Sequence, residues 1–285
     1  MTELNYLNYL NLSGYIINSL VTFFATPLFN LADVGDLSAK YQTIITPTGF
    51  SFAIWGIIFL SQGIFAIAQM HKEYRSLAIV QDGISYWYFI VCIAQSAWVF
   101  AFGYELIGLS TVVMVTILYG LYQIVQQQTE IDMLWNEYWL FKFPFEIHCG
   151  WIFAASLLNL NILLISIGAG PVVQFISALV SIGFLVEVAV YYLKMDRLNY
   201  ALPAVFAWAT FGMFVELGNP KELIIATFCS TAITAIRILT LVICVALVIG
   251  VVALAVLDLV KRRESSRGNG ELTTLTNDDK PSYIA

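Results

Sequence analysis

Long runs of apolar residues, separated by short polar stretches, follow one another along nearly the whole chain. Because a bilayer-spanning helix needs about 20 mostly apolar residues, each such run predicts one membrane span. Eight runs are long enough, near residues 12–31, 47–70, 84–104, 107–127, 143–168, 173–193, 199–217 and 238–260. The pattern therefore predicts an all-α, polytopic helical membrane protein.

The composition agrees with this class. Of the 285 residues 60% are apolar and 11% are charged, and the mean hydropathy is +0.81, whereas a soluble domain carries about 25% charged residues. The net charge of -6 says little about partners, because the charges lie in loops and tails between apolar runs. The lipid bilayer is the first expected partner, and no nucleic-acid partner is expected.

The basic residues predict the topology, because cytoplasmic loops retain Lys and Arg. Eight spans place ten basic residues on the side of the two termini and three on the other, which predicts that both termini are cytoplasmic. The apolar stretch 221–237 is short and bracketed by charge, so we predict an interfacial or re-entrant helix there. The tail 261–285 has too little apolar surface to fold and is predicted to be disordered.

Candidate catalytic groups are few. The four cysteines form no CxxC pair and are interpreted as small buried hydrophobic residues. The chain has two histidines and no phosphate loop, nucleophile elbow or HExxH motif, so an enzyme is not expected. His148, in "PFEIHCGW", is either an axial ligand for haem iron or an interfacial histidine bonded to a neighbour.

Carboxylates deep in a helical bundle would indicate an ion or proton path. Most acidic residues here fall within a turn or two of the predicted span ends. Glu187 is the deepest, about 10 Å from Lys194 at 1.5 Å per residue. Glu187 and Glu146 are the residues that would support a transporter of a small hydrophobic or anionic metabolite, which is the alternative function.

Tryptophans give a stronger indication of a binding site. Trp87, Trp135 and Trp139 suit the aromatic belt at the headgroup level. Four others lie about eight or more residues inside their spans, where an indole N–H needs a partner: Trp55, Trp98, Trp151 and Trp208. Such residues on several helices either pack in the core or line one apolar pocket for a small molecule.

Three sequence segments resemble the tryptophan-rich sensory protein family, which includes the mitochondrial translocator protein (the peripheral benzodiazepine receptor). The segment "PTGFSFAIWGIIF" (47–59) is similar to the family's second helix, with Pro47, Trp55 and Gly56 in register. The segment "AQSAW" (94–98) keeps Trp98 of the third helix but lacks the family's asparagine and first tryptophan. The segment "FPFEIHCGWIFAASLLNLN" (143–161) matches the fifth helix best, at Pro144, Trp151 and Asn159.

The resemblance implies a division of the chain. Residues 1–168 are similar to the five-helix core, 169–260 to a three-helix membrane extension seen in longer relatives, and 261–285 form the tail. The extension is recognised by "DRLNYALPAVFAWA" (196–209). The five-helix relatives are usually dimers, but three extra helices occupy space that such an interface would use. A homodimer is therefore one alternative for this chain.

By the same resemblance, the protein is expected to be a membrane receptor or sensor without a required cofactor. In the family the cavity accepts porphyrins and haem-like tetrapyrroles, and in some members sterols, so a bound porphyrin or haem is the first expected guest. Light-driven porphyrin degradation and a structural role in a larger complex are further alternatives. The resemblance and the pattern together predict these ligand-binding residues: Pro47, Gly49, Phe52, Trp55, Trp98, Phe145, His148, Trp151 and Asn159.

Overall fold

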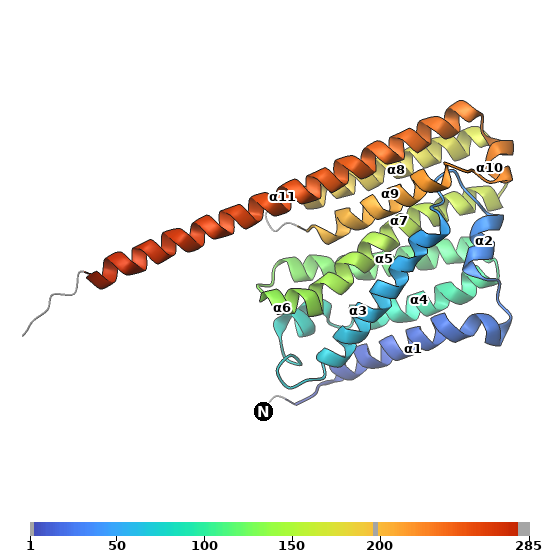
Figure 1. Ribbon diagram of the computed structural model, residues 1–285. Helices are drawn as coiled ribbons and strands as arrows, with labels where there is room; N and C mark the ends of the chain where they lie inside the picture. The colour runs from blue at the N-terminus through green and yellow to red at the C-terminus, as the bar shows by residue number, and fades with distance from the viewer. Residues whose placement is uncertain (1–2, 196–198, 279–285) are drawn as a thin grey trace, which may run out of the picture.

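The computed structural model describes residues 3–195 and 199–278, and every regular element among them is helical. Figure 1 shows the long helices side by side in one bundle. The helices are α1 (Tyr6–Phe29), α2 (Val34–Lys40), η1 (Gly49–Ala53), α3 (Ile54–Ala68), η2 (Ile79–Ile84), α4 (Trp87–Gly103), α5 (Ile107–Thr129), α6 (Trp135–Glu137), η3 (Tyr138–Lys142), α7 (Phe143–Ser166), α8 (Pro171–Lys194), α9 (Ala201–Glu216), α10 (Glu222–Thr227) and α11 (Ser230–Asp278).

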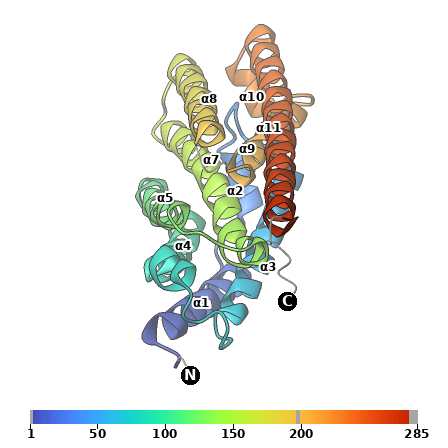
Figure 2. The same ribbon diagram turned by 90° about the vertical axis from the view of Figure 1, so that its left-hand side faces the viewer.

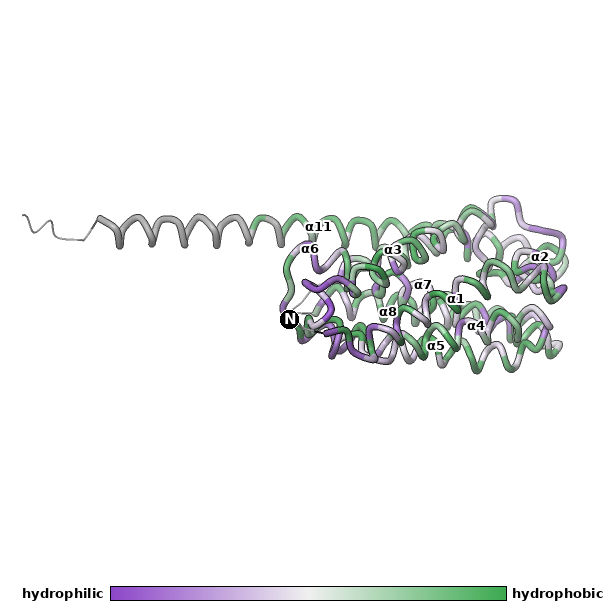
Figure 3. Tube along the Cα trace, turned by 90° about the horizontal axis from the view of Figure 1, so that it is seen from below, coloured by the Kyte–Doolittle hydropathy of each residue, from purple (hydrophilic) through white to green (hydrophobic). Residues whose placement is uncertain are grey.

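Seven helical segments of the described chain are long and apolar enough to cross a membrane. In Figure 3 apolar residues colour most of the long helices, and hydrophilic residues gather toward the ends of the bundle. The seven segments are Tyr6–Phe29, Gly49–Ala68, Ile79–Gly103, Ile107–Thr129, Trp135–Ser166, Pro171–Lys194 and Ser230–Leu257. The prediction of an all-α, polytopic membrane protein is confirmed.

The eighth predicted span, 199–217, corresponds to α9, which has 16 residues. At 1.5 Å per residue α9 covers about 24 Å, less than the roughly 30 Å hydrocarbon core. This helix packs against α7, α8 and α11, and more than half of its residues are buried. It is an inner helix that returns along the bundle between α8 and α11, so α11 leaves the bundle at the end where the described chain begins (Figure 1).

Helix α7 occupies the middle of the bundle. It contacts α3, α5, α8 and α9, and Figure 2 shows it between the group α1, α4 and α5 and the group α8, α9 and α11. Of its 24 residues 13 are buried. A helix in this position can present side chains to both parts of the chain.

The interfacial helix predicted at 221–237 is found only in part. Residues Glu222–Thr227 form α10, but the chain is already in α11 from Ser230. Arg237 was expected to mark a boundary, yet its guanidinium lies 4.9 Å from the ring centroid of Phe214. The ring attracts the cation, and the half-buried Arg237 does not interrupt the helix.

The disordered tail predicted from residue 261 is also corrected, because the backbone of α11 continues to Asp278. Extending a long helix needs no new nucleus, and Lys, Arg and Glu after residue 260 favour helix. Residues 279–285, with Lys280, and residues 196–198, with Arg197, lie outside the described residues. The cysteine prediction holds for Cys92, Cys149 and Cys244, which are buried, and is wrong for Cys229, which is exposed.

Candidate functional site

A cavity of ≈ 490 Å³ lies inside the bundle at the end that carries α2. Its walls come from α1, α3, α4, α5 and α7, and its mouth from α2, the segment before η1, and the region between α9 and α10. This volume falls within the range of about 300–1,000 Å³ that is usual for small-molecule sites. The cavity is therefore large enough to enclose a drug-sized ligand.

Aromatic rings from three helices form much of the wall. Trp55 of α3, Trp98 of α4 and Trp151 of α7 all line the cavity. The ring of Trp98 stacks on Phe102 with centroids 4.8 Å apart, and Trp151 meets Phe52 edge to face at 5.6 Å. These contacts fix the orientation of the indoles, so the cavity offers rigid aromatic surfaces.

A hydrogen-bonded cluster holds the wall together beside Trp98. The Trp98 Nε1–H donates to Asn159 Oδ1 at 3.3 Å, and Asn159 Nδ2 donates to Thr111 Oγ1 at 2.7 Å and Ser110 Oγ at 3.2 Å. Asn159 therefore joins α7 to α4 and α5. Both the oxygen and the nitrogen of its side-chain amide have hydrogen-bond partners within the protein.

Gln95 is a second polar group in the cavity wall, in the middle of α4. Its side chain is 4% exposed, and its Oε1 has no hydrogen-bond partner among the described residues. A buried carbonyl oxygen without a donor costs about 1–3 kcal/mol. A ligand with an N–H or O–H group in the cavity could supply that donor.

Helix α2 covers the mouth, where Val34, Gly35 and Ser38 contribute to the lining. The helix begins at the cap Asp33, whose carboxylate accepts a hydrogen bond from Gly35 N at 2.7 Å. At its other end, Lys40 pairs with Glu105 in the turn between α4 and α5. The Tyr41 hydroxyl donates to the same carboxylate oxygen at 2.7 Å.

The hydrogen bonds among Lys40, Tyr41 and Glu105 form a latch that ties α2 to the turn after α4. They shift the pKa of each of the three groups. The hydrogen bond from Lys40 holds the pKa of the Glu105 carboxyl below its ordinary value, with Tyr41 adding to the effect. The hydrogen bond to Glu105 raises the pKa of Lys40 and that of Tyr41. The ionised form of the carboxyl and the protonated forms of its partners are therefore favoured together, which keeps α2 tied to the core.

Helix α9 holds the segment that starts the second span. The Trp208 Nε1–H of α9 donates to Ser51 O at 2.9 Å, and Thr48 N donates to Gly212 O at 3.1 Å. A Cβ added at Gly212 would lie 2.0 Å from Ser51 Oγ and 3.0 Å from Pro47 Cβ. Gly212 thus permits the close approach of the segment that carries Pro47 to the cavity.

Seven of the nine predicted binding residues line the cavity: Pro47, Gly49, Phe52, Trp55, Trp98, Trp151 and Asn159. Of the four deep tryptophans, Trp208 does not line it, because its indole is turned to Ser51 and to Phe50, whose ring centroid is 5.3 Å away. Trp135 and Trp139 are 71% and 46% exposed, as the aromatic-belt interpretation expects.

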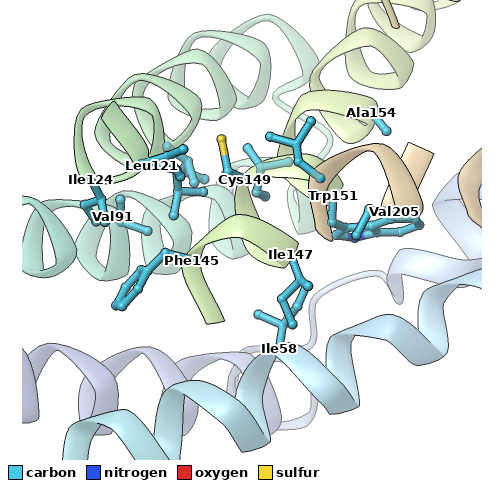
Figure 4. Packing of buried hydrophobic residues seen from close by; sticks show 14 of the residues in the cluster. Ile58, Val91, Leu121, Ile124, Phe145, Ile147, Cys149, Trp151, Ala154 and Val205 are labelled. Carbon is cyan, nitrogen blue, oxygen red and sulfur yellow. The ribbon is translucent and has the colours of Figure 1, made fainter. Parts of the chain in front are cut away.

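Phe145 and His148 are fully buried and are not among the lining residues. Phe145 packs against Phe65 and Tyr88, with ring centroids 5.1 and 5.2 Å away. In Figure 4 Phe145 and Trp151 point in different directions from α7. Six residues, or one and two-thirds turns, separate them, so they cannot share a face of the helix.

His148 is bonded to a neighbour, which is the second of the two interpretations given above. Its Nδ1 lies 2.8 Å from Gln62 Nε2, and the Tyr88 hydroxyl donates to Gln62 Oε1 at 3.3 Å. His148 Nε2 is buried and has no hydrogen-bond partner among the described residues. The imidazole meets the ring of Trp55 at 5.7 Å from outside the cavity lining, so it is not placed to ligate the iron of a guest there.

The carboxylates named for the transporter alternative are also outside the lining. Glu187 is exposed on α8. Glu146 is buried, where Tyr138 Oη donates to its Oε2 at 2.9 Å and Lys142 Nζ lies 3.9 Å from its Oε1. Neither carboxylate faces the cavity.

Sequence reasoning missed several cavity residues, above all Gln95, Glu216, Lys221 and those of α2. The Asp33 cap could have revealed α2, since Asp before a short run is a usual helix start. Gln95 lies three residues before Trp98, in the segment that resembles the family's third helix. Glu216 and Lys221 are far along the chain from the core motifs, and no spacing rule links them to α2.

The fold is that of a polytopic helical membrane protein, and its bundle contains a cavity lined mostly by apolar residues. The chain matches the model of a family described as TSPO-like protein over residues 8–253. It therefore belongs to this family, and the match includes both the core and most of the extension. No curated protein and no solved structure matches the chain significantly.

Proposed function

We propose that this protein is a membrane receptor or sensor that binds a tetrapyrrole or a similar flat, apolar molecule inside the bundle. The observation that carries the proposal is the ≈ 490 Å³ cavity into which Trp55, Trp98 and Trp151 converge from three helices. Membership in the TSPO-like family supports a binding or transport role in the membrane.

The chemistry of the wall favours an aromatic guest. Indole and phenyl faces gain about 0.5–1.5 kcal/mol per aromatic pair beyond the burial of area. Trp98 and Trp151 are already fixed by Phe102 and Phe52, so little side-chain entropy is lost when a ligand is bound. The free Oε1 of Gln95 adds one acceptor for an N–H or O–H group.

A tetrapyrrole would be held here by its ring faces and edges and not through a metal. His148 is outside the lining. Metal-free protoporphyrin is therefore a suitable probe ligand. A sterol, which is apolar but not aromatic, would fill the same volume without stacking, so it is the second ligand class to compare.

The proposal is tested by titrating the purified protein in lipid nanodiscs with protoporphyrin IX and following tryptophan quenching. We expect saturable quenching and an apparent Kd that rises about 2- to 10-fold in Trp55→Ala and in Trp151→Ala, from the loss of one stacking contact. Trp139→Ala is the matched control, because Trp139 is exposed and outside the cavity.

The Kd values are compared and not the quenching amplitudes, because each variant has lost one emitter. Quenching no greater than in nanodiscs without protein would overturn the proposal. Equal Kd values in all three variants would also overturn it, since the guest would then be bound elsewhere.

A further inference from the structure

Two charged side chains stand among the residues that line the cavity, and both come from the C-terminal extension. Glu216 ends α9 and Lys221 precedes α10, at the mouth that α2 covers. The remaining lining residues are apolar or uncharged. Any formal charge on a ligand must therefore be met at this mouth.

The carboxylate of Glu216 already has two partners within the protein. Gln42 Nε2 donates to Glu216 Oε1 at 2.7 Å, and Lys221 Nζ lies 3.7 Å from the same oxygen. The Glu216 side chain is 12% exposed. A cationic group on a ligand would have little access to this carboxylate.

The ammonium group of Lys221 shares this ion pair with Glu216 but is exposed enough to take a further partner. Its distance of 3.7 Å from Glu216 Oε1 exceeds that of a hydrogen bond, and its side chain is 53% exposed. Lysine has three N–H donors and no acceptor. The group at the mouth that can still take a partner is thus a cation, and its natural complement is an anion.

The inner part of the cavity has different requirements. Gln95 lies eight residues before the end of α4 at Gly103, or about 12 Å deeper than the mouth at 1.5 Å per residue. The cavity is also lined by the apolar groups Met114, Ile117 and Ile152. A ligand that fits both ends has an apolar body inside and a charged group outside.

We infer that the ligand is an anionic amphiphile whose carboxylate pairs with Lys221 while its apolar body lies among the tryptophans. The inference rests on the function proposed above and adds the ligand's charge, its orientation and a direct contribution of the extension to the site. The binding site of this chain is then built from both parts, and the five-helix core alone does not complete it.

The experiment compares protoporphyrin IX with its dimethyl ester, which has the same ring system and no carboxylate. In nanodiscs of zwitterionic lipid we expect the acid to bind about fivefold more tightly than the ester, the size of one partly exposed ion pair. In Lys221→Gln the acid should lose this advantage while the ester keeps its affinity. Lys221→Arg, which retains the charge, should keep the preference for the acid.

Lys194→Gln is the matched control, because Lys194 is an exposed lysine at the end of α8 and does not line the cavity. It should leave the ratio of the two affinities unchanged. Ester binding also shows that Lys221→Gln is folded, since the apolar part of the site must be intact to bind it.

Two outcomes would overturn the inference and leave the proposed function standing: equal affinities in the unaltered protein, or a preference that survives in Lys221→Gln. If adding anionic lipid to the nanodiscs abolishes the preference, Lys221 serves a lipid headgroup and the inference is wrong. If neither the acid nor the ester binds, the proposed function fails with it.

Discussion

The indole of Trp98 and the amide of Asn159 form a hydrogen bond of 3.3 Å across α4 and α7. The same amide donates to Thr111 and Ser110 of α5, so three helices meet at one side chain on the cavity wall. In this chain the asparagine therefore orients a tryptophan that lines the cavity.

Replacing Asn159 by Leu should destabilise the protein and release Trp98. The indole N–H would lose its acceptor in an apolar setting, at a cost of about 1–2 kcal/mol. Thermal unfolding in detergent and the affinity for protoporphyrin should both decrease. Asn161→Leu is the control on the same helix, because Asn161 bonds to Ser181 of α8 and is not a lining residue. Asn161→Leu should lower the unfolding temperature without lowering the affinity for protoporphyrin. If both variants lowered the affinity equally, Asn159 would not be the residue that orients Trp98 for binding.

Gly212→Ala in α9 should disturb the mouth of the cavity, because α9 packs against the segment that carries Pro47 and Ser51. The new methyl group would meet Ser51 Oγ at 2.0 Å and Pro47 Cβ at 3.0 Å, so the segment 47–51 must move. Overpacking of this kind costs about 1–3 kcal/mol. We expect a lower unfolding temperature and weaker binding of protoporphyrin.

The control for this variant is Gly108→Ala in α5, where an added Cβ meets nothing within 4 Å. It should be neutral or stabilising, because alanine favours helix over glycine by about 0.5–1 kcal/mol. The double variant Gly212→Ala with Ser51→Ala should recover part of the loss. No recovery would mean that Ser51 is not the group that limits the approach.

Gly56→Leu should block the cavity without unfolding the protein. Gly56 lines the cavity, and a Cβ placed there meets nothing within 4 Å. A leucine side chain can therefore occupy ligand volume while clashing with no protein atom at its base. Gly183→Leu, at an equally open glycine of α8 outside the lining, should bind protoporphyrin normally. Normal binding by Gly56→Leu at an unchanged unfolding temperature would contradict the location of the site.

Helix α2, which covers the mouth of the cavity as a lid, should detach from the turn after α4 more readily at acid pH. The pKa of Glu105 lies below its ordinary value of 4.5, so the latch is fully formed above that value and is lost as pH falls through the lowered pKa. The pKa of Lys40 lies above its ordinary value of 10.5, so the latch persists into the alkaline range and is lost beyond it.

Hydrogen exchange of residues 34–41, corrected for the intrinsic effect of pH on exchange, measures this loosening. Protection should be high near neutral pH and fall only when the pH drops below the ordinary carboxyl value of 4.5, through the lowered pKa of Glu105. In Glu105→Gln protection should be low already at neutral pH and change little with acid. An acid response of the same size in Glu105→Gln would show that another group controls the lid.

Much of the architecture was predictable because apolar length is a direct physical requirement of the bilayer. The boundaries of α5 and α8 fall within two residues of the predicted spans. The N-terminal helix starts six residues early, because the side chain of Asn5 caps it by accepting hydrogen bonds from Leu7 N and Asn8 N. Capping groups lie outside the apolar run and escape a count of apolar residues.

The cavity was predictable where its residues share a helix face with the tryptophans, and less so elsewhere. Phe145 and His148 were predicted to bind the ligand together with Trp151 of the same helix, but both are fully buried and lie outside the lining. Lys221 and Glu216 reach the cavity only because α9 packs on α7 and its end meets the loop that holds Gln42. That contact joins positions 174 residues apart and has no local trace in the sequence.

The central claim is that the bundle holds its ligand among Trp55, Trp98 and Trp151. An experimental structure of the protein saturated with protoporphyrin IX in nanodiscs tests it most directly. We predict density for the ring system between these three indoles, with the acidic edge toward Lys221. An empty cavity at saturation, or porphyrin bound on the outer surface of the helices, would contradict the account.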